Sequence, residues 1–194
     1  MAAERAASRQ RQTKETDVSV RLNLDGSGTA EVATGVAFLD HLLRALAMHA
    51  RFDLELKARG DLEVDAHHTV EDVAIVLGEA LADALGDRSG IARFGDATVP
   101  LDESRATVAL DCGGRGYAII DIPLRGVTIG SLPATLVPHF LESFALRGGV
   151  TLHAIASGRD DHHLAEATFK ALARALRQAC AVDATLRGRS PSTK

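Results

Sequence analysis

Two copies of the motif HHxxE dominate the chemistry that this sequence could perform. Each copy contains two adjacent histidines and a glutamate, at His67, His68, Glu71, His162, His163 and Glu166. On a helix, residues four apart share a face, so the first histidine and the glutamate of a motif can bind one metal ion. The second histidine lies about 100° around the helix axis and must reach a different ion. Each motif therefore predicts ligands for two separate metal sites.

An internal repeat relates the two motifs. Each HHxxE follows a turn that contains aspartate and opens a long stretch with apolar residues at helical spacing. A further histidine precedes each motif, and His41 and His139 are separated by the same number of residues as Gly60 and Gly158. Because a repeat gives equivalent residues equivalent surroundings, we interpret these histidines as two sets of ligands rather than as solvated surface side chains.

The simplest symmetric assembly has two metal sites, each with three histidines and one glutamate. The first site combines His41, His68, His162 and Glu166. The second site combines His67, His139, His163 and Glu71. An octahedral ion held in this way keeps open positions for substrate or water. Imidazole and carboxylate ligands around such an ion favour Mn or Fe, with Co, Ni and Zn as alternatives.

The bulk composition argues against two classes of partner. The 194 residues carry a formal net charge of -4 and a pI near 6.0, so there is no excess of cations to bind nucleic acid or an anionic membrane. No apolar run is long enough to span a bilayer, and the first residues lack the apolar core of a signal peptide. Cys112 and Cys180 form no metal or disulfide motif, and we expect them to pack inside a cytoplasmic protein.

The elements that position the histidines follow from apolar periodicity. In the first half we expect strands at 16–24, 29–34 and 52–57 and helices near 39–46 and 70–85. In the second half we expect strands near 105–111, 116–121 and 150–156 and helices near 135–147 and 162–181. The first two strands read as a hairpin, and Gly86 is placed to end a helix. The pattern ββαβα, present twice, predicts an α+β fold of two similar halves, with helices on one side of mostly antiparallel sheets.

The same pattern divides the chain into segments. We expect a flexible N-terminal segment at 1–12, the two halves at 13–92 and 93–183, and a flexible C-terminal tail at 184–194. Asp65 and Asp161 are expected to cap the helices that follow them. The Gly- and Pro-containing stretch IGSLPATLVP is expected to be a mobile loop.

Several segments together resemble one enzyme family from about Thr13 to Lys194. These segments are FLDHLLRALAMHARFDL, HHTVED, RFGDATVPLDES, GRDDHHLAEATFKALARAL and PSTK. The chain is similar to imidazoleglycerol-phosphate dehydratases. The resemblance implies a duplicated fold of the ribosomal protein S5 domain 2-like type, two Mn²⁺ per subunit bound between subunits, and trimers that assemble into a 24-subunit shell. It also implies a cytoplasmic enzyme of histidine biosynthesis.

The reaction implied by the resemblance removes water from D-erythro-imidazole glycerol phosphate and gives imidazole acetol phosphate, through a metal-bound imidazolate. Glu15 is then the candidate acid or base, and Glu71 and Glu166 are catalytic as metal ligands. The residues implied to contact the substrate are Glu15, His41, His49, His67, Arg93, Arg115, His162, Lys170, Ser192, Thr193 and Lys194. Arg93 and Arg115 match phosphate-contacting arginines, whose forked donors suit a phosphate group. The tail 184–194 is thereby a substrate-binding tail.

Two other functions also suit these residues, and two acidic residues have no firm role. The repeated ligands also suit a dinuclear metallohydrolase, in which a bridging hydroxide attacks an ester or amide. They equally suit a metal-binding shell protein without catalysis, although such a protein needs no phosphate-binding arginines. Gly116 stands where the family usually has proline, which would loosen the backbone beside Arg115. Asp102 and Glu103 are candidates to support the site, and we assign them no firm role.

Overall fold

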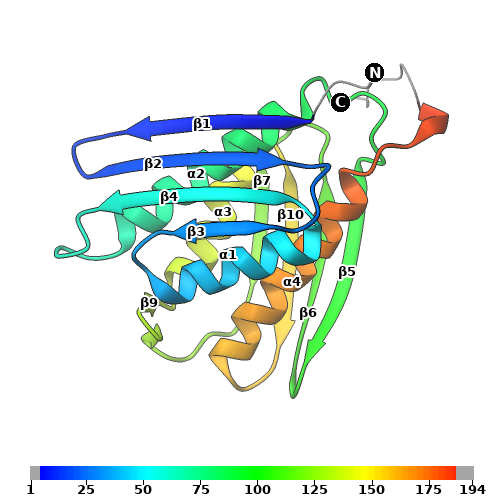
Figure 1. The fold of residues 1–194 in the computed structure, drawn as a ribbon. Coiled ribbons are helices and arrows are strands. Elements are labelled where there is room, and N and C mark those ends of the chain that lie inside the picture. The colour runs from blue at the N-terminus through cyan, green and yellow to red at the C-terminus, as the bar shows by residue number, and fades with distance from the viewer. Residues whose placement is uncertain (1–4, 187–194) are drawn as a thin grey trace.

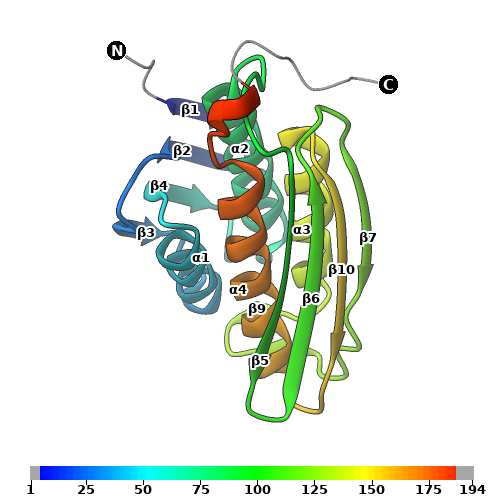
Figure 2. The same ribbon diagram turned by 90° about the vertical axis from the view of Figure 1, so that its right-hand side faces the viewer.

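Residues 5–186 are described by a computed structural model, in which two four-stranded sheets enclose a layer of four long helices (Figures 1 and 2). The strands are β1 (Ala6–Gln12), β2 (Thr16–Asn23), β3 (Ala30–Ala33), β4 (Asp53–Gly60), β5 (Phe94–Leu101), β6 (Ser104–Asp111), β7 (Tyr117–Asp121), β8 (Thr128–Ile129), β9 (Leu132–Pro133) and β10 (Thr151–Ser157). The helices are α1 (Ala37–Ala50), α2 (His67–Leu85), α3 (Leu136–Gly148), α4 (Asp161–Ala179) and the short 3-10 helix η1 (Ala184–Leu186).

The first sheet has the strand order β1-β2-β4-β3. Strand β2 pairs antiparallel with β1 and β4, and β3 pairs parallel with β4. The expected hairpin of 16–24 with 29–34 is therefore wrong, because β4 lies between these two segments. The carboxylate of Asp53, at the start of β4, stabilises the crossover by accepting hydrogen bonds from the backbone N–H groups of residues 27–29 at 2.9–3.1 Å.

The second sheet repeats this order as β5-β6-β10-β7. Strand β6 pairs antiparallel with β5 and β10, and β7 pairs parallel with β10. Strand β5 is an addition that periodicity does not predict, because its sequence FGDATVPL contains Gly and Pro, which weaken the signal of an edge strand. The duplicated α+β fold is confirmed, and the four-stranded sheet of each half has one strand more than the predicted ββαβα. The second half also contains the short strands β8 and β9.

Strand β1 lies in the segment that we expect to be flexible. Its residues AASRQRQ pair with β2 along their whole length, so the expectation is wrong for 6–12. The strand is held by polar contacts rather than by apolar burial: Arg9 Nη2 lies 2.8 Å from Asp83, and Arg11 Nε lies 2.8 Å from Asp72, both on α2. A pattern of apolar residues could not reveal a strand stabilised in this way.

The four helices pack in pairs across the middle of the molecule, α2 against α3 and α1 against α4 (Figure 2). Gly78 allows the first pair to approach, because a Cβ atom there would lie 2.7 Å from the carbonyl oxygen of Phe144. Helix α2 ends at Gly86, in the left-handed region at φ +56, as expected. Within the described residues, no helix has the length and apolar character required to cross a membrane.

Two further expectations concern the second half. The stretch 129–138, expected as a mobile loop, contains the short antiparallel pair of β8 and β9, in which Ile129 and Leu132 are buried. Cys112 and Cys180 are free and buried, as expected of packing residues. An isolated antiparallel bridge between Ile91 and Val182 joins the segment before β5 to the segment after α4.

Candidate metal centres

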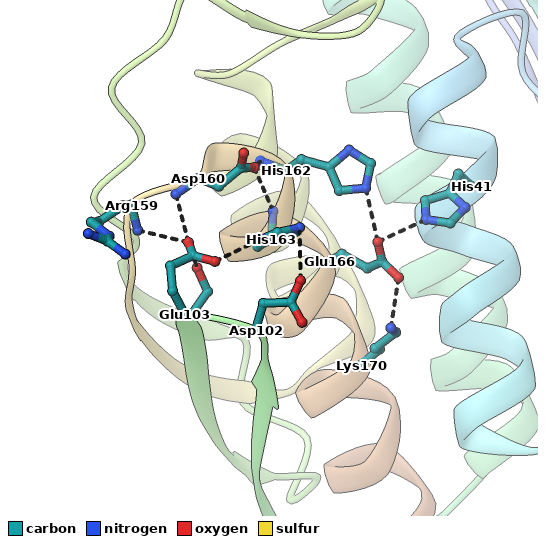
Figure 3. A network of polar contacts seen from close by, with 10 residues as sticks. His41, Asp102, Glu103, Arg159, Asp160, His162, His163, Glu166 and Lys170 are labelled. Carbon is teal, nitrogen blue, oxygen red and sulfur yellow. Dashed lines mark hydrogen bonds and ion pairs between the residues drawn. The ribbon is translucent and has the colours of Figure 1, made fainter.

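Three predicted ligands meet where α1 approaches the N-terminal part of α4. His41 from α1 and His162 from α4 each place Nε2 3.1 Å from Oε2 of Glu166, and both rings point toward this carboxylate (Figure 3). One ligand atom from each residue lies within 4.8 Å of the others. The ring of Phe38 packs against both histidine rings, with centroids 5.9 and 4.8 Å away. We refer to His41, His162 and Glu166 as cluster A.

A lysine gives cluster A its electrostatic character. Lys170 Nζ lies 2.7 Å from Oε1 of Glu166, one helical turn along α4. Burial raises the pKa of Glu166, but Lys170 and His41 outweigh burial and lower this pKa to about 2. The side chain of His49 on α1 faces the same region, where burial and the charges of Lys170 and Arg174 lower its pKa. Glu166 is therefore ionised and His49 is neutral at neutral pH.

The equivalent group lies between α2 and α3. The Nε2 atoms of His67 and His139 lie 3.9 and 3.6 Å from carboxylate oxygens of Glu71, and the two imidazole rings stack with centroids 4.8 Å apart. These three residues, which we call cluster B, also bring one ligand atom each within 4.8 Å of the others. Ile75, four residues after Glu71, stands where cluster A has Lys170.

Both clusters have the donor set of a divalent transition-metal site. Imidazole nitrogen and carboxylate oxygen are the donors preferred by first-row metals with open coordination positions. In cluster B, Nε2 of His139 is buried without a hydrogen-bond partner among residues 5–186. An unpaired buried polar atom costs free energy, and a bound cation would remove this cost. The residues present therefore fit a metal ion.

Capping residues fix the first turn of each motif helix. Asp160 accepts hydrogen bonds from the backbone N–H groups of both histidines that begin α4. The expected cap Asp161 is wrong, because its carboxylate instead accepts hydrogen bonds from the N–H groups of residues 125–126. Asp65 accepts a hydrogen bond from the N–H of His67 at 2.7 Å, but the N-cap position of α2 is Ala66 and not Asp65 as expected. These contacts fix the direction in which the motif side chains leave their helices.

The second histidine of each motif points away from the cluster on its own helix. His68 places Nδ1 3.0 Å from Oδ2 of Asp61. His163 places Nδ1 2.8 Å from Oε2 of Glu103, as Figure 3 shows. The chain thus brings together three of the four ligands predicted for each site. His68 and His163 are not among them, because their position about 100° around each helix turns them outward.

Hydrogen bonds and charge couple His163 to Glu103 and His68 to Asp61. Hydrogen bonds from His163, Ser104 and the N–H groups of residues 159–160 keep the pKa of Glu103 well below its usual range. Glu103 raises the pKa of His163 in turn. Asp61 raises the pKa of His68 through its hydrogen bond and its charge.

Glu15 lies in the tight turn between β1 and β2, close to His68. The turn is closed by Thr13, whose Oγ1 accepts hydrogen bonds from the N–H groups of Glu15 and Thr16 at 3.1 and 2.9 Å. The charge of Glu15 contributes to the raised pKa of His68, after the contributions of Asp61. The side chain of Glu15 is exposed, so the chain presents a carboxylate beside an outward-pointing imidazole.

The predicted phosphate contacts lie elsewhere. Arg93 forms a forked pair with Asp111 at 2.7 and 3.0 Å, and its N–H bonds to the carbonyl of Ala179 at the end of α4. Because α4 rises 1.5 Å per residue, that end lies about 20 Å from Glu166. Arg115, in the loop before β7, is exposed.

Gly116, beside Arg115, lies in close contact with α3, since a Cβ atom there would be 2.4 Å from the carbonyl oxygen of Leu146. The glycine therefore allows close packing of this loop against α3, a reason for glycine here that the sequence did not show. Ser192, Thr193 and Lys194 lie outside the described residues.

Sequence reasoning missed two features of these centres. Asp61 had no motif to mark it, since it follows β4 in a polar turn. The contact of Phe38 with cluster A was also missed, although its position three residues before His41 places both on neighbouring parts of one helix face. Glu103 was named with Asp102 as a possible supporting residue, but its contact with His163 was not predicted.

Comparison with known proteins agrees with this architecture. The family model for imidazoleglycerol-phosphate dehydratase matches residues 34–176. Imidazoleglycerol-phosphate dehydratases from Dehalococcoides mccartyi and Methanoculleus marisnigri are 55% and 50% identical to this chain, over 98% and 95% of its length and 96% and 95% of theirs.

Two crystal structures are also similar. Imidazoleglycerol-phosphate dehydratase from Staphylococcus aureus is 31% identical, with a TM-score of 0.82, over 91% of this chain and 99% of the other. The enzyme from Pyrococcus furiosus, in complex with (S)-C348, is 33% identical, with a TM-score of 0.81, over 95% of this chain and 98% of the other. The fold, the family model and the near full-length identity agree that this chain belongs to the imidazoleglycerol-phosphate dehydratase family.

Proposed function

We propose that this chain is a metal-dependent hydro-lyase that converts D-erythro-imidazole glycerol phosphate into imidazole acetol phosphate and water in histidine biosynthesis. The single observation that carries the proposal is the pair of equivalent clusters, A and B, in a chain of this family. Dehydration breaks one C–H and one C–O bond, the proton and hydroxide leave as water, and the resulting enol becomes a ketone. The carbon that loses its proton has no adjacent carbonyl, so the reaction needs strong electrostatic assistance.

Clusters A and B are the residues that would hold two Mn²⁺ per chain, with Fe, Co, Ni or Zn as alternatives. A divalent ion bound there supplies a Lewis acid for an imidazole nitrogen or a hydroxyl oxygen. Glu71 and Glu166 would give each ion a carboxylate, and the histidines supply neutral donors. The low pKa of Glu166 keeps its carboxylate ready for a cation at neutral pH.

The remaining site residues would act on the substrate. Glu15, exposed beside His68, is proposed to transfer the proton, because a carboxylate within hydrogen-bond reach is sufficient for this step. Lys170 and His49 line the approach to cluster A, where a cation and a neutral imidazole can bind polar substrate groups. Arg115 and Arg93, whose guanidinium is also paired with Asp111, are proposed to bind the phosphate.

A single chain does not complete this site. His68 and His163 point outward, and Arg93 lies at the far end of α4 from cluster A. We propose that another copy of the chain supplies the fourth ligand to each cluster and the arginines to the phosphate. Trimers arranged in a 24-subunit shell would provide such contacts.

The test is turnover of the proposed substrate. Mn-loaded protein is mixed with imidazole glycerol phosphate, and product is followed by ultraviolet absorbance beside a chelator-treated sample. We expect product only in the metal-loaded sample. Absence of product with folded, fully metallated protein would contradict the proposal; release of inorganic phosphate would favour a hydrolase, and stable metal binding without turnover would favour a storage protein.

A further inference from the structure

The two halves contain a pair of carboxylates that the dehydratase proposal leaves without a role. Asp61 follows β4 in the first half, and Glu103 lies in the turn between β5 and β6 in the second half. Each contacts Nδ1 of an outward-pointing histidine, at 3.0 Å for His68 and 2.8 Å for His163. Asp61 and Glu103 do not occupy equivalent positions in the repeat. Both halves nevertheless place a carboxylate against Nδ1 of the outward-pointing histidine.

We propose that Asp61 and Glu103 are positioning residues that fix the orientation and tautomer of His68 and His163, so that Nε2 of each ring is presented as a metal ligand. The inference rests on the proposed metal sites and deepens them. An ionised carboxylate can only accept a hydrogen bond, so Nδ1 must carry the proton. A neutral imidazole protonated at Nδ1 keeps its lone pair on Nε2. A carboxylate behind a ligating histidine in this way raises its basicity and restricts its rotation.

The burial of Asp61 supports a role toward a ligand rather than toward stability. Its Oδ1 is buried without a hydrogen-bond partner among the described residues. Such an atom destabilises the fold, so the carboxylate is not explained by stability alone. Its other oxygen is the one that contacts His68.

Glu103 is fixed more firmly and from several directions. One carboxylate oxygen accepts hydrogen bonds from Ser104 Oγ and from the N–H groups of residues 159–160, at 2.8–3.1 Å. The second oxygen is left for His163. The Glu103 carboxylate is thus tied directly to the loop that begins α4, and it contacts His163 on the helix that carries cluster A (Figure 3). Asp102, at 3.8 Å from Nε2 of His163, is the nearby carboxylate on the ligand side of the ring.

The halves use one equivalent position differently. Thr16 pairs with Gly60, and the register of β6 with β10 sets Ser104 opposite Gly158. Because Gly60 and Gly158 are equivalent, Glu15 corresponds to Glu103. In the second half the glutamate at this position, Glu103, contacts Nδ1 of His163. In the first half Asp61 holds the histidine, which leaves Glu15 free for proton transfer.

The experiment measures Mn²⁺ binding, separately from turnover, by electron paramagnetic resonance of the free ion in titrations of the assembled protein. Asp61→Ala should weaken one of the two sites by about 10- to 100-fold and leave the other unchanged. Asp61→Asn, whose amide oxygen can still accept the Nδ1 hydrogen, should restore most of the affinity. Glu63→Ala removes an exposed carboxylate from the same turn without touching the ring, and it should leave both affinities at the wild-type value.

A double-mutant cycle shows whether Asp61 acts through His68. Asp61→Ala in a His68→Ala background should cause no further loss, because the interaction is already absent. Glu103→Ala should weaken the other site, and Glu103→Gln should restore it. Two intact sites in Asp61→Ala, equal weakening of both sites, or additive losses in the cycle would overturn the inference while leaving the dehydratase proposal standing. Wild-type protein that binds no Mn²⁺ would overturn both.

Discussion

The two halves of this chain share a fold but have diverged at equivalent positions around their metal centres. Glu103 is bound by a histidine, a serine and two backbone N–H groups, whereas its counterpart Glu15 is exposed in a tight turn. Glu166 is paired with Lys170, whereas Glu71 has Ile75 at the corresponding place. Duplication therefore supplied two copies of one ligand framework. The neighbouring residues then diverged. The first half has the exposed glutamate Glu15, which can act as an acid or base, and the second half has the cation Lys170 beside its cluster.

Removing the free glutamate should separate chemistry from metal binding most clearly. Glu15→Gln keeps the size of the side chain but removes its ability to exchange a proton, so kcat should fall by about 10²- to 10⁴-fold. Metal content should stay unchanged, because Glu15 belongs to neither cluster. Glu103→Gln is the matched control at the equivalent position and should change kcat far less at saturating Mn²⁺. Equal losses in the two variants would remove the functional difference between these positions.

Replacing the lysine tests the second difference. Lys170→Met makes cluster A resemble cluster B, and it removes a cation that competes for Glu166. We expect Mn²⁺ to bind cluster A more tightly, since one like charge is lost. We also expect kcat/KM to fall by about 10- to 100-fold, the size of a lost charged hydrogen bond to substrate. Steady-state kinetics and metal titration together check both effects; weaker metal binding would contradict this role for Lys170.

The equivalent glycines should differ in their tolerance of a methyl group. At Gly158 a Cβ atom would lie 2.0 Å from Ser104 Oγ and 2.9 Å from its Cα. At Gly60 the closest contact, also 2.0 Å, is to Oγ1 of Thr69, a side chain that can rotate. Gly158→Ala should therefore lower the free energy of unfolding by about 1–3 kcal/mol, and Gly60→Ala by less. Urea unfolding measures both, and the reverse order would show that the halves do not pack as described.

The smallest effect concerns the crossover loops. Hydrogen bonds from the N–H groups of residues 27–29 lower the pKa of Asp53 below its ordinary value of 3.8. Its stabilisation is thus present above about pH 4 and is lost as the pH falls through the folded-state pKa. The second half has Thr151 at the equivalent position, whose hydroxyl does not titrate and donates to the carbonyl of Arg115.

Asp53→Asn tests this pH dependence. Because Asp53 is close to solvent, the stability difference between pH 5 and pH 3 should shrink by less than about 1 kcal/mol in the variant. Urea unfolding at the two pH values checks the prediction. Thr151→Val is the control, and it should leave the pH dependence as in the wild type. A wild-type pH dependence in Asp53→Asn would exclude Asp53 as the source.

Apolar periodicity and the repeat were sufficient to predict the helices, the duplication and the members of both clusters. They failed where polar contacts determine structure. Strand β1 is held by arginine–aspartate pairs, and the Asp53 carboxylate stabilises the crossover before β3. No pattern of apolar residues reports these contacts. Asp61 was missed because its partner His68 is near in space only after the turn following β4 has folded. His68 and His163 point away from the cluster on their own helix, so the fourth ligand predicted for each site is not brought together with the others within one chain.

The central claim is that clusters A and B are the metal sites of a dehydratase. Anomalous diffraction at the manganese absorption edge from crystals of the Mn-loaded protein tests it most directly. The account predicts two anomalous peaks per chain, one contacting His41, His162 and Glu166 and the other contacting His67, Glu71 and His139. Peaks at other residues, or none at either cluster in crystals shown to contain manganese, would contradict it.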